Sequence, residues 1–379
     1  MAVRILPSSK SARPRLPSLR ECSKLPLAIP EPSGVVAADF NEDGKPDLAI
    51  AGAISVYVLL GGGNGTFAPA NGSPLPVPSP PYDDFASPRT GPALAVGDFN
   101  RSGHAGLAVG LFQNLAAAIL LGKGDGTFSF ADTLASINGT PTMSLTAADF
   151  NGDGDLDLVA ANTLNGVSPV VLLGYGHGAF NAVSQNIEIS AISSAAGDFN
   201  GDGILDLVLG GSAISEAGNG GSSSLLLGRG DGTFTPGPSF AANGFLAVGD
   251  FNGDGKLDLA VAETQHNTVT IFLGHGNGTF TMAQGSPMTV GNVPQAILAA
   301  DFNNDGKLDL AIANSGDGTV ALFLGNGDGT FTPSAGSPYP VGPGASGLAV
   351  ADFNGDGKLD LAVVNTSDGT GTVSILLQQ

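Results

Sequence analysis

The chain has 379 residues, 42% of them apolar, which is enough for two or three ordinary domains or one large repeat domain and argues against global disorder. Its 34 acidic residues outnumber its 14 basic ones and give a net charge of −20, which argues against a nucleic-acid partner because phosphates require clustered Lys and Arg. No apolar run reaches about eighteen residues, so no membrane span is expected, and the one cysteine, Cys22, excludes a disulfide framework and a zinc site built from thiolates.

The chain begins with a basic segment. Six of the 14 basic residues lie within the first 24 positions. The segment has no apolar stretch of about 7–15 residues, so it does not match a secretory signal peptide. We expect residues 1–23 to be a disordered tail, with a targeting leader or a misassigned start as the alternatives, and residues 24–379 to form a single domain.

The tripeptide Asp-Phe-Asn marks an internal repeat. It begins at Asp39, Asp98, Asp149, Asp198, Asp250, Asp301 and Asp352. The successive spacings are 59, 51, 49, 52, 51 and 51 residues. Seven copies of a unit of this length predict a repeat architecture.

Each unit contains the same series of short apolar runs, which the first unit illustrates in chain order. Residues 35–38 precede an acidic loop, residues 48–51 follow it, residues 56–60 come after a polar turn, and a glycine-rich turn then ends in Gly-Thr-Phe at Phe67. The runs are rich in β-branched residues and apolar on both faces, which indicates strands covered on both sides. We therefore predict an all-β fold, a seven-bladed β-propeller of four-stranded blades, with the alanine-rich first strands at the central axis.

The two ends of the chain are predicted to share the last blade. The seventh unit stops at Gln379, after its third strand, and residues 25–30 stand before the first unit where a fourth strand stands before every other unit. We expect an N-terminal strand near residues 24–30 to complete blade seven and close the ring. A closed ring leaves no long strand edge exposed.

Six of the seven units carry an acidic loop of the form Asp-x-Asn-x-Asp-Gly-x-x-Asp. The oxygen-bearing side chains at positions 1, 3, 5 and 9 are, unit by unit, Asp39, Asn41, Asp43 and Asp47; Asp149, Asn151, Asp153 and Asp157; Asp198, Asn200, Asp202 and Asp206; Asp250, Asn252, Asp254 and Asp258; Asp301, Asn303, Asp305 and Asp309; and Asp352, Asn354, Asp356 and Asp360. Position 7 varies, as expected if only its backbone carbonyl binds a cation, and is occupied by Lys45, Asp155, Ile204, Lys256, Lys307 and Lys358.

Hard oxygen ligands in a flexible loop predict Ca²⁺, with about six structural ions in the molecule. The loop is not an EF-hand, because its twelfth position is an apolar strand residue such as Ile50 rather than a glutamate. Eighteen of the 34 acids are the aspartates at positions 1, 5 and 9 of these loops, and six calcium ions would bring the net charge from −20 to about −8. The alternative is that the same residues form Asx-turns whose carboxylates are solvated.

The second loop departs from this pattern. Arg101 and Ser102 follow Asn100, and Gly106 stands at the ninth position. Two carboxylates are lost and a basic residue is gained. We therefore predict that blade two binds no calcium.

These motifs resemble the FG-GAP/VCBS repeat family. The resemblance rests on Asp-Phe-Asn-Gly-Asp-Gly-Lys-Leu-Asp-Leu followed by Leu-Gly-x-Gly-x-Gly-Thr-Phe, and it covers residues 25–379. It implies a propeller similar to that of integrin α-subunits, with calcium held for structure on one face and ligands bound elsewhere. The family also includes some fungal lectins, many bacterial surface proteins and some lyases, so the fold alone does not define the activity.

The turns of a four-stranded blade alternate between its two ends. The acidic loops and glycine turns therefore share one face of the ring, and the turns between strands two and three share the other face with the blade connections. The longest connection, residues 68–92, holds an exposed aromatic and acidic group that we take as a candidate ligand site: Tyr82, Asp83, Asp84 and Phe85. A tolerated insertion is the alternative, and the absence of Trp weakens a role in sugar stacking.

We expect a non-enzymatic, calcium-stabilised binding or adhesion module for a glycan or a protein, monomeric and located outside the cell or at its surface. Millimolar extracellular calcium suits the weak sites of such modules, whereas the lack of a signal peptide opposes this location. The alternatives are a structural or assembly module with a protein partner, and a lyase or hydrolase that uses the central channel. An enzyme is disfavoured because the four histidines fall at unrelated repeat positions and the inner strands show no polar cluster at equivalent depths.

Overall fold

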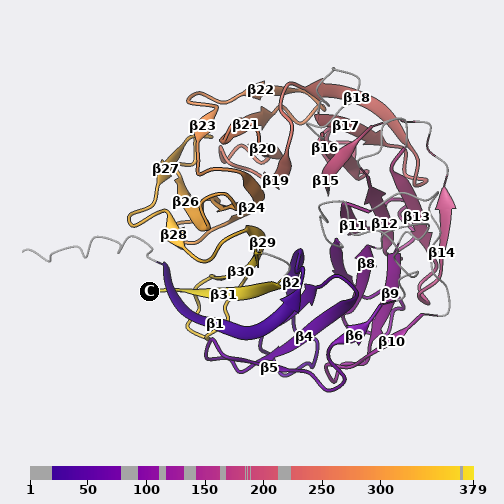
Figure 1. Cartoon of the computed structure of the whole chain (residues 1–379). Helices are drawn as coiled ribbons and strands as arrows, with labels where there is room; N and C mark the ends of the chain where they lie inside the picture. The colour runs from indigo at the N-terminus through magenta and orange to yellow at the C-terminus, as the bar shows by residue number, and fades with distance from the viewer. Residues whose placement is uncertain are drawn as a thin grey trace, which may run out of the picture.

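The computed structural model describes residues 19–77, 93–110, 117–131, 142–162, 168–183, 185, 187, 189–211, 223–367 and 370–379. Within these ranges every regular element is a strand, and the strands form seven separate sheets arranged in a ring (Figure 1). Each sheet is one blade, and its first strand lies nearest the central axis. The predicted all-β, seven-bladed propeller is confirmed.

The first four blades each take their strands in chain order. Blade one comprises β2 (Gly34–Ala38), β3 (Asp47–Ala51), β4 (Ser55–Gly61) and β5 (Phe67–Pro69). Blade two comprises β7 (Leu94–Gly97), β8 (Gly106–Gly110), β9 (Ala117–Gly122) and β10 (Phe128–Phe130). Blade three comprises β11 (Ser144–Ala148), β12 (Asp157–Ala161), β13 (Val170–Gly174) and β14 (Phe180–Val183). Blade four comprises β15 (Ala191–Gly197), β16 (Asp206–Gly211), β17 (Ser223–Gly228) and β18 (Phe234–Phe240).

The last three blades follow the same plan, except that blade seven combines both ends of the chain. Blade five comprises β19 (Phe245–Gly249), β20 (Asp258–Glu263), β21 (Thr268–Gly274) and β22 (Phe280–Met282). Blade six comprises β24 (Pro294–Ala300), β25 (Asp309–Asn314), β26 (Thr319–Gly325) and β27 (Phe331–Pro333). Blade seven comprises β29 (Ala345–Ala351), β30 (Asp360–Ser367), β31 (Thr370–Gln378) and β1 (Leu19–Pro30).

The N-terminal strand β1 closes the ring by pairing antiparallel with β31, as predicted (Figure 1). It begins at Leu19 rather than near residue 24, so the last residues of the segment expected to be a tail belong to the blade. Leu19 is 6% exposed and packs in a buried cluster with Leu361 and Leu376. The earlier start is explained by the burial of this additional apolar side chain.

Three blades carry a short fifth strand that the sequence analysis did not predict. These strands are β6 (Leu75–Pro76), β23 (Met288–Thr289) and β28 (Tyr339–Pro340), and they pair with β4, β21 and β26. Each follows a Gly-Ser-Pro tripeptide whose serine Oγ accepts a hydrogen bond from a backbone N–H of the third strand, as Ser73 does from Val58 at 3.0 Å. Pairing over two residues is too short to leave a periodic hydrophobic pattern.

The core lies between neighbouring blades. The second strands, such as β3 and β12, are buried along their whole length because the adjacent blades cover both of their faces. In six seams the phenylalanine of Asp-Phe-Asn packs against the phenylalanine that ends the next blade's glycine turn, as Phe40 does against Phe128 with ring centres 5.5 Å apart. This contact fixes each acidic loop against the following blade.

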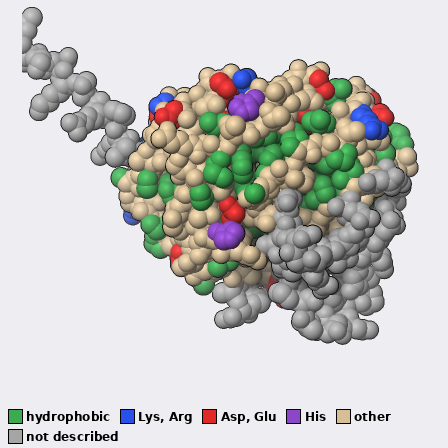
Figure 2. Space-filling model, turned by 90° about the horizontal axis from the view of Figure 1, so that it is seen from above, with side chains coloured by type: hydrophobic (Ala, Val, Ile, Leu, Met, Phe, Trp, Pro, Cys, Tyr) green, Lys and Arg blue, Asp and Glu red, His purple; other side chains and the backbone are tan. Residues whose placement is uncertain are grey.

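Seen edge-on, charged side chains are concentrated along the upper edge of the molecule, and apolar side chains gather across the rim between the two faces (Figure 2). Exposed apolar side chains on the outermost strands include Phe130 on β10 and Met282 on β22. In the part of the chain that the structure describes, no helix is long and apolar enough to cross a membrane.

Candidate metal centres

The six complete acidic loops share one hydrogen-bond pattern, which blade one illustrates. The first-position carboxylate of Asp39 accepts bonds from the backbone N–H groups of Asp43 and Gly44, at 3.2 and 2.8 Å. Asn41 accepts from the N–H of Asp43, and Asp43 accepts from the N–H of Lys45. Equivalent bonds recur in blades three to seven. The side chains therefore set the backbone of the turn, as in Asx-turns.

The ninth-position aspartate ties the loop to the third strand of its blade. The two oxygens of Asp47 accept hydrogen bonds from Phe40 N–H and Gly61 N–H, at 2.8 and 2.7 Å. The other five loops repeat both bonds, with Gln378 in place of the glycine in blade seven. All six of these carboxylates are fully buried.

Burial raises the pKa of the ninth-position carboxylates above the usual range. The value reaches about 6 for Asp157, Asp309 and Asp360. The two backbone hydrogen bonds oppose this increase in pKa, and repulsion from the carboxylates at positions 1 and 5 adds to it. The three acids of a loop thus act on one another electrostatically.

This arrangement fits a hard cation in the chemistry of its donors. Every side chain offered at positions 1, 3, 5 and 9 presents oxygen, and an oxygen that accepts one N–H keeps a second lone pair. Within the described ranges, however, no group of three His, Cys, Asp or Glu side chains is gathered closely enough to hold a metal ion. The Asx-type bonding is present, but the ninth-position carboxylates are buried rather than solvated, and calcium binding stays a prediction.

The lysine side chains at position 7 pair with acids of their own loops, a role that the sequence analysis did not predict. Lys45 Nζ lies 3.1 Å from Asp43 Oδ2, and this hydrogen bond lowers the pKa of Asp43. Lys256 and Lys358 pair with the fifth-position carboxylates of their own loops at 3.5 and 3.8 Å. A lysine two residues after an aspartate was the available signal, and it supplies a local counter-ion for part of the loop charge.

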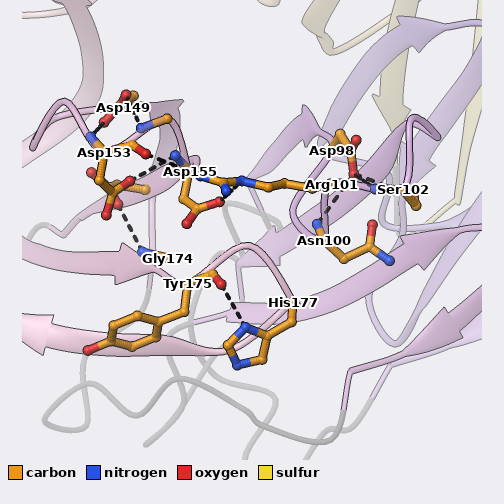
Figure 3. A network of polar contacts seen from close by, with 12 residues as sticks. Asp98, Asn100, Arg101, Ser102, Asp149, Asp153, Asp155, Gly174, Tyr175 and His177 are labelled. Carbon is orange, nitrogen blue, oxygen red and sulfur yellow. Dashed lines mark hydrogen bonds and ion pairs between the residues drawn. The ribbon is translucent and has the colours of Figure 1, made fainter.

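The incomplete loop of blade two is linked to its neighbours by side chains. Asp98 keeps the usual turn by accepting from the N–H groups of Ser102 and Gly103. Arg101 extends to blade three, where its Nη2 donates to Asp153 O at 3.2 Å and its Nε forms an ion pair with Asp155 (Figure 3). The acidic residue at position 7 of blade three therefore has a basic partner in blade two.

On the other side of the same loop, His104 Nδ1 contacts Glu42 Oε1 of blade one. Blade two, which we predict to bind no calcium, is thus joined to both adjacent loops by pairs of charged or ionisable side chains. Neither pair is visible from local sequence, because the partners lie in different repeats.

Backbone hydrogen bonds connect the same face from blade to blade. Gly126 N–H of blade two donates to Phe40 O of blade one at 2.9 Å, and four other glycine turns make the equivalent bond. Blade seven has no glycine turn, and there Gln378 Nε2 donates to Phe302 O of blade six. The sequence analysis did not identify Gln378. This residue ends the third strand of blade seven, whereas the third strand of each of the other six blades ends in glycine.

The remaining predicted ligand site lies outside the described residues. Tyr82, Asp83, Asp84 and Phe85 all belong to this undescribed part of the chain. The sequence analysis found no polar cluster at equivalent depths of several inner strands, and it did not identify a hydroxyl contact between two of them. Ser194 Oγ on β15 lies 2.9 Å from Ser144 Oγ and 2.6 Å from Thr146 Oγ1 on β11. Ser194 thus bonds to both hydroxyls of β11 across adjacent blades.

The FG-GAP-like repeat family matches this chain at residues 39–109, 98–160, 198–261, 250–312 and 301–363, which together cover most of its length. The chain belongs to the FG-GAP repeat family. The FG-GAP match includes the incomplete loop of blade two, so the family pattern tolerates the loss of that loop's carboxylates.

Curated relatives match only part of this FG-GAP chain. Cartilage acidic protein 1 of Homo sapiens is 28% identical over 160 residues, covering 36% of this chain and 23% of the human protein. The Mus musculus protein of the same name is 28% identical over 132 residues, covering 31% of this chain and 20% of its own length. The matched region therefore spans less than a quarter of these relatives.

Two solved structures have a fold similar to that of this chain at low identity. A lectin of Agrocybe aegerita, described for specific recognition of non-reducing terminal N-acetylglucosamine, has a TM-score of 0.53 and 19% identity, covering 81% of this chain and 80% of its own. BBS1N, in complex with ARL6DN, has a TM-score of 0.59 and 14% identity, covering 95% of this chain and 96% of its own. At these identities the likeness shows the fold alone.

Proposed function

We propose that this FG-GAP propeller is a calcium-stabilised, non-enzymatic binding module that acts, as a monomer, outside the cell or at its surface on a glycan or a protein. The observation that carries the proposal is the set of six acidic loops, each with three carboxylates and an amide oxygen on one short turn. A module whose acids are concentrated in this way gains most where millimolar calcium is present.

The side chains that would hold calcium are those at positions 1, 3, 5 and 9 of each loop, with the carbonyl at position 7. Bound calcium would supply positive charge between carboxylates that repel one another. The chain itself sets the turn through the first-position aspartate and ties it to the third strand through the ninth-position aspartate. Calcium and hydrogen bonds would thus stabilise the same loop by separate means.

The binding role is supported by the propeller fold and by the names of proteins with a similar fold or sequence. A propeller of similar fold is described as a lectin, and the curated relatives are named after cartilage, a tissue rich in extracellular matrix. The alternative ligand is a protein, as expected for an assembly module. The second propeller of similar fold was solved with a protein partner.

Thermal unfolding in calcium and in chelator tests the metal part of the proposal. With a dissociation constant of about 0.1 mM, 1 mM calcium would stabilise the fold by roughly 1.4 kcal/mol per site. The melting midpoint should therefore be clearly higher in calcium than in EDTA, with magnesium as the matched control. An unchanged midpoint would contradict calcium stabilisation.

A glycan array run beside a protein pull-down tests the binding part. Specific retention of one glycan class in calcium would establish a lectin-like module. Capture of one protein with no glycan binding would favour the assembly module instead. Turnover of an array glycan would contradict the non-enzymatic proposal.

A further inference from the structure

Glycine turns between the third and fourth strands lie against the acidic loop of the preceding blade, as blades five and four illustrate. Gly278 N–H of blade five donates to Phe199 O in the loop of blade four at 2.9 Å. A Cβ on Gly278 would lie 3.7 Å from Cβ of Asn200, a predicted calcium ligand. A Cβ on Gly201, the next loop residue, would lie 3.0 Å from Gly276 O. The residue between these two turn glycines is therefore placed beside the facing loop.

This residue, which stands between the last two glycines of the turn, is called the turn-tip residue here. Gly126, Gly329 and Gly65 make the same bond to the loops of blades one, five and seven, at 2.9, 3.0 and 2.8 Å. Four complete loops are thus covered by the turn of the next blade. The turn-tip residues that face blades one, four, five and seven are Asp125, Asn277, Asp328 and Asn64.

The identity of the turn-tip residue follows the loop that it faces rather than its own blade. The four covered complete loops face Asp or Asn, whereas the incomplete loop of blade two faces His177, and Figure 3 shows both. Gly178 N–H, next to His177, donates to Phe99 O of that loop at 2.9 Å. Blade two itself carries Asp125, and blade three, whose own loop is complete, carries His177. This pattern is expected if the turn-tip residue serves the preceding blade.

The aspartate turn tips have a free oxygen. Asp125 Oδ1 accepts from the backbone N–H and the hydroxyl of Thr127, at 2.9 and 2.6 Å. These bonds shape the turn and lower the pKa of Asp125, so the carboxylate is ionised at neutral pH. Its Oδ2 accepts no hydrogen bond among the contacts described, and the residue is exposed. Asn277 accepts the same two bonds from Thr279 but has a neutral amide nitrogen in place of the second oxygen.

A carboxylate at the turn tip acts on the facing loop in two ways. It adds to the negative charge around a bound cation, and it offers an oxygen to a site that the loop does not fill. Calcium takes about six to eight oxygen ligands, and the loop offers one donor group at each of positions 1, 3, 5, 7 and 9. Because the turn tip is exposed, solvent and salt screen the attraction and limit its effect to a small factor in affinity.

We propose that Asp125 and Asp328 raise the calcium affinity of the loops of blades one and five, so that each of these sites is shared between two blades. This inference rests on the proposed function and deepens it, because it makes the six sites unequal and lets calcium link neighbouring blades. The neutral turn tips Asn277 and Asn64 give the loops of blades four and seven no such charge. The loop of blade six faces no glycine turn and receives none either.

The test is a calcium titration of the full chain, followed by hydrogen exchange and mass spectrometry of the peptides that contain each loop. Each loop then gives its own calcium midpoint. Asp125→Asn should raise the midpoint of blade one about threefold, because a charge is lost while both bonds from Thr127 are kept. Asn277→Asp should lower the midpoint of blade four by a similar factor. This second variant gains affinity, so misfolding cannot account for its effect.

His177→Asp is the matched control, since it places the same charge opposite the incomplete loop. It should leave the midpoints of blades one and four unchanged. Unchanged midpoints in Asp125→Asn and Asn277→Asp would overturn the inference and leave calcium binding intact. Equal shifts in all loops, or a shift in blade five instead of blade four for Asn277→Asp, would do the same. If no loop of the wild type is protected by calcium, the proposed calcium stabilisation fails together with this inference.

Discussion

At the scale of single residues, the carboxylates of one acidic loop have separable roles. Asp258 at position 9 is fully buried, and its oxygens accept from Phe251 N–H and Gly274 N–H at 2.8 and 2.7 Å. These bonds join the loop to β21 without any cation. Asp254 at position 5 is exposed, where it accepts from Lys256 N–H and lies 3.5 Å from Lys256 Nζ. Substitution can therefore distinguish hydrogen bonding from cation binding.

Asp258→Asn should destabilise the protein by about 1–3 kcal/mol whether calcium is present or not, because an amide N–H would face a backbone N–H in a buried site. Asp254→Asn keeps the shape of an exposed side chain and removes an exposed ion pair with Lys256, so in EDTA it should lower the free energy of unfolding by at most about 1 kcal/mol. In calcium the loss should be larger, because a cation ligand is removed as well. Denaturant unfolding of both variants in each buffer measures the difference. Equal losses for the two variants in both buffers would show that no cation is bound.

Arg101 is expected to stabilise the seam between blades two and three independently of calcium. Its side chain is 57% exposed, so Arg101→Ala should cost at most about 1 kcal/mol. A double-mutant cycle with Asp155→Asn should give a coupling energy of the same sign and size in calcium and in EDTA. A coupling that appears only in calcium would mean that Arg101 acts through the neighbouring loop's metal.

At the scale of strands, the repeat predicted most of the fold because three signals agreed: apolar runs, turn glycines and a period that is close to fifty residues in all but the first unit. The contacts that were not predicted join different repeats and therefore have no signal in the local sequence. Arg101 meets Asp155 in the next repeat, and Gln378 meets Phe302 across a seam. Of the candidate site, the loop residues could be predicted from the sequence, but the burial of Asp258 could not, since it depends on how the loop packs against β21.

The closing strand β1 provides the prediction at this scale. Deletion of residues 1–18 leaves β1 intact and should not change the unfolding midpoint. Deletion of residues 1–30 removes the partner of β31 and uncovers the cluster that contains Leu25 and Ile29, which are 6% and 0% exposed. The longer deletion should therefore yield an aggregating or dye-binding protein with an exposed strand edge. A soluble chain with wild-type unfolding would show that the ring does not need closing by β1.

At the scale of the whole molecule, the acidic loops impose a common pH dependence. Six ninth-position carboxylates have a raised pKa, chiefly because they are buried. Exposed acids such as Asp43, Asp125 and Asp328 have a pKa lowered by hydrogen bonds, from Lys45, Thr127 and Thr330 respectively. The lowered group titrates below the usual value of 3.8 and the raised group above it, so the two effects fall in different pH ranges.

Without calcium, stability should fall as the pH rises from about 4 to about 6. In this window the folded chain binds more protons than the unfolded chain, because the folded pKa reaches about 6 at Asp157, Asp309 and Asp360 against 3.8 in the unfolded chain. Calcium competes with those protons, so the gain in melting midpoint on adding calcium should be small near pH 4 and grow until the carboxylates are ionised. Thermal unfolding across this range in EDTA and in calcium measures both slopes. A midpoint in EDTA that rises with pH, or a calcium gain that does not depend on pH, would contradict buried carboxylates as the shared site of protons and cation.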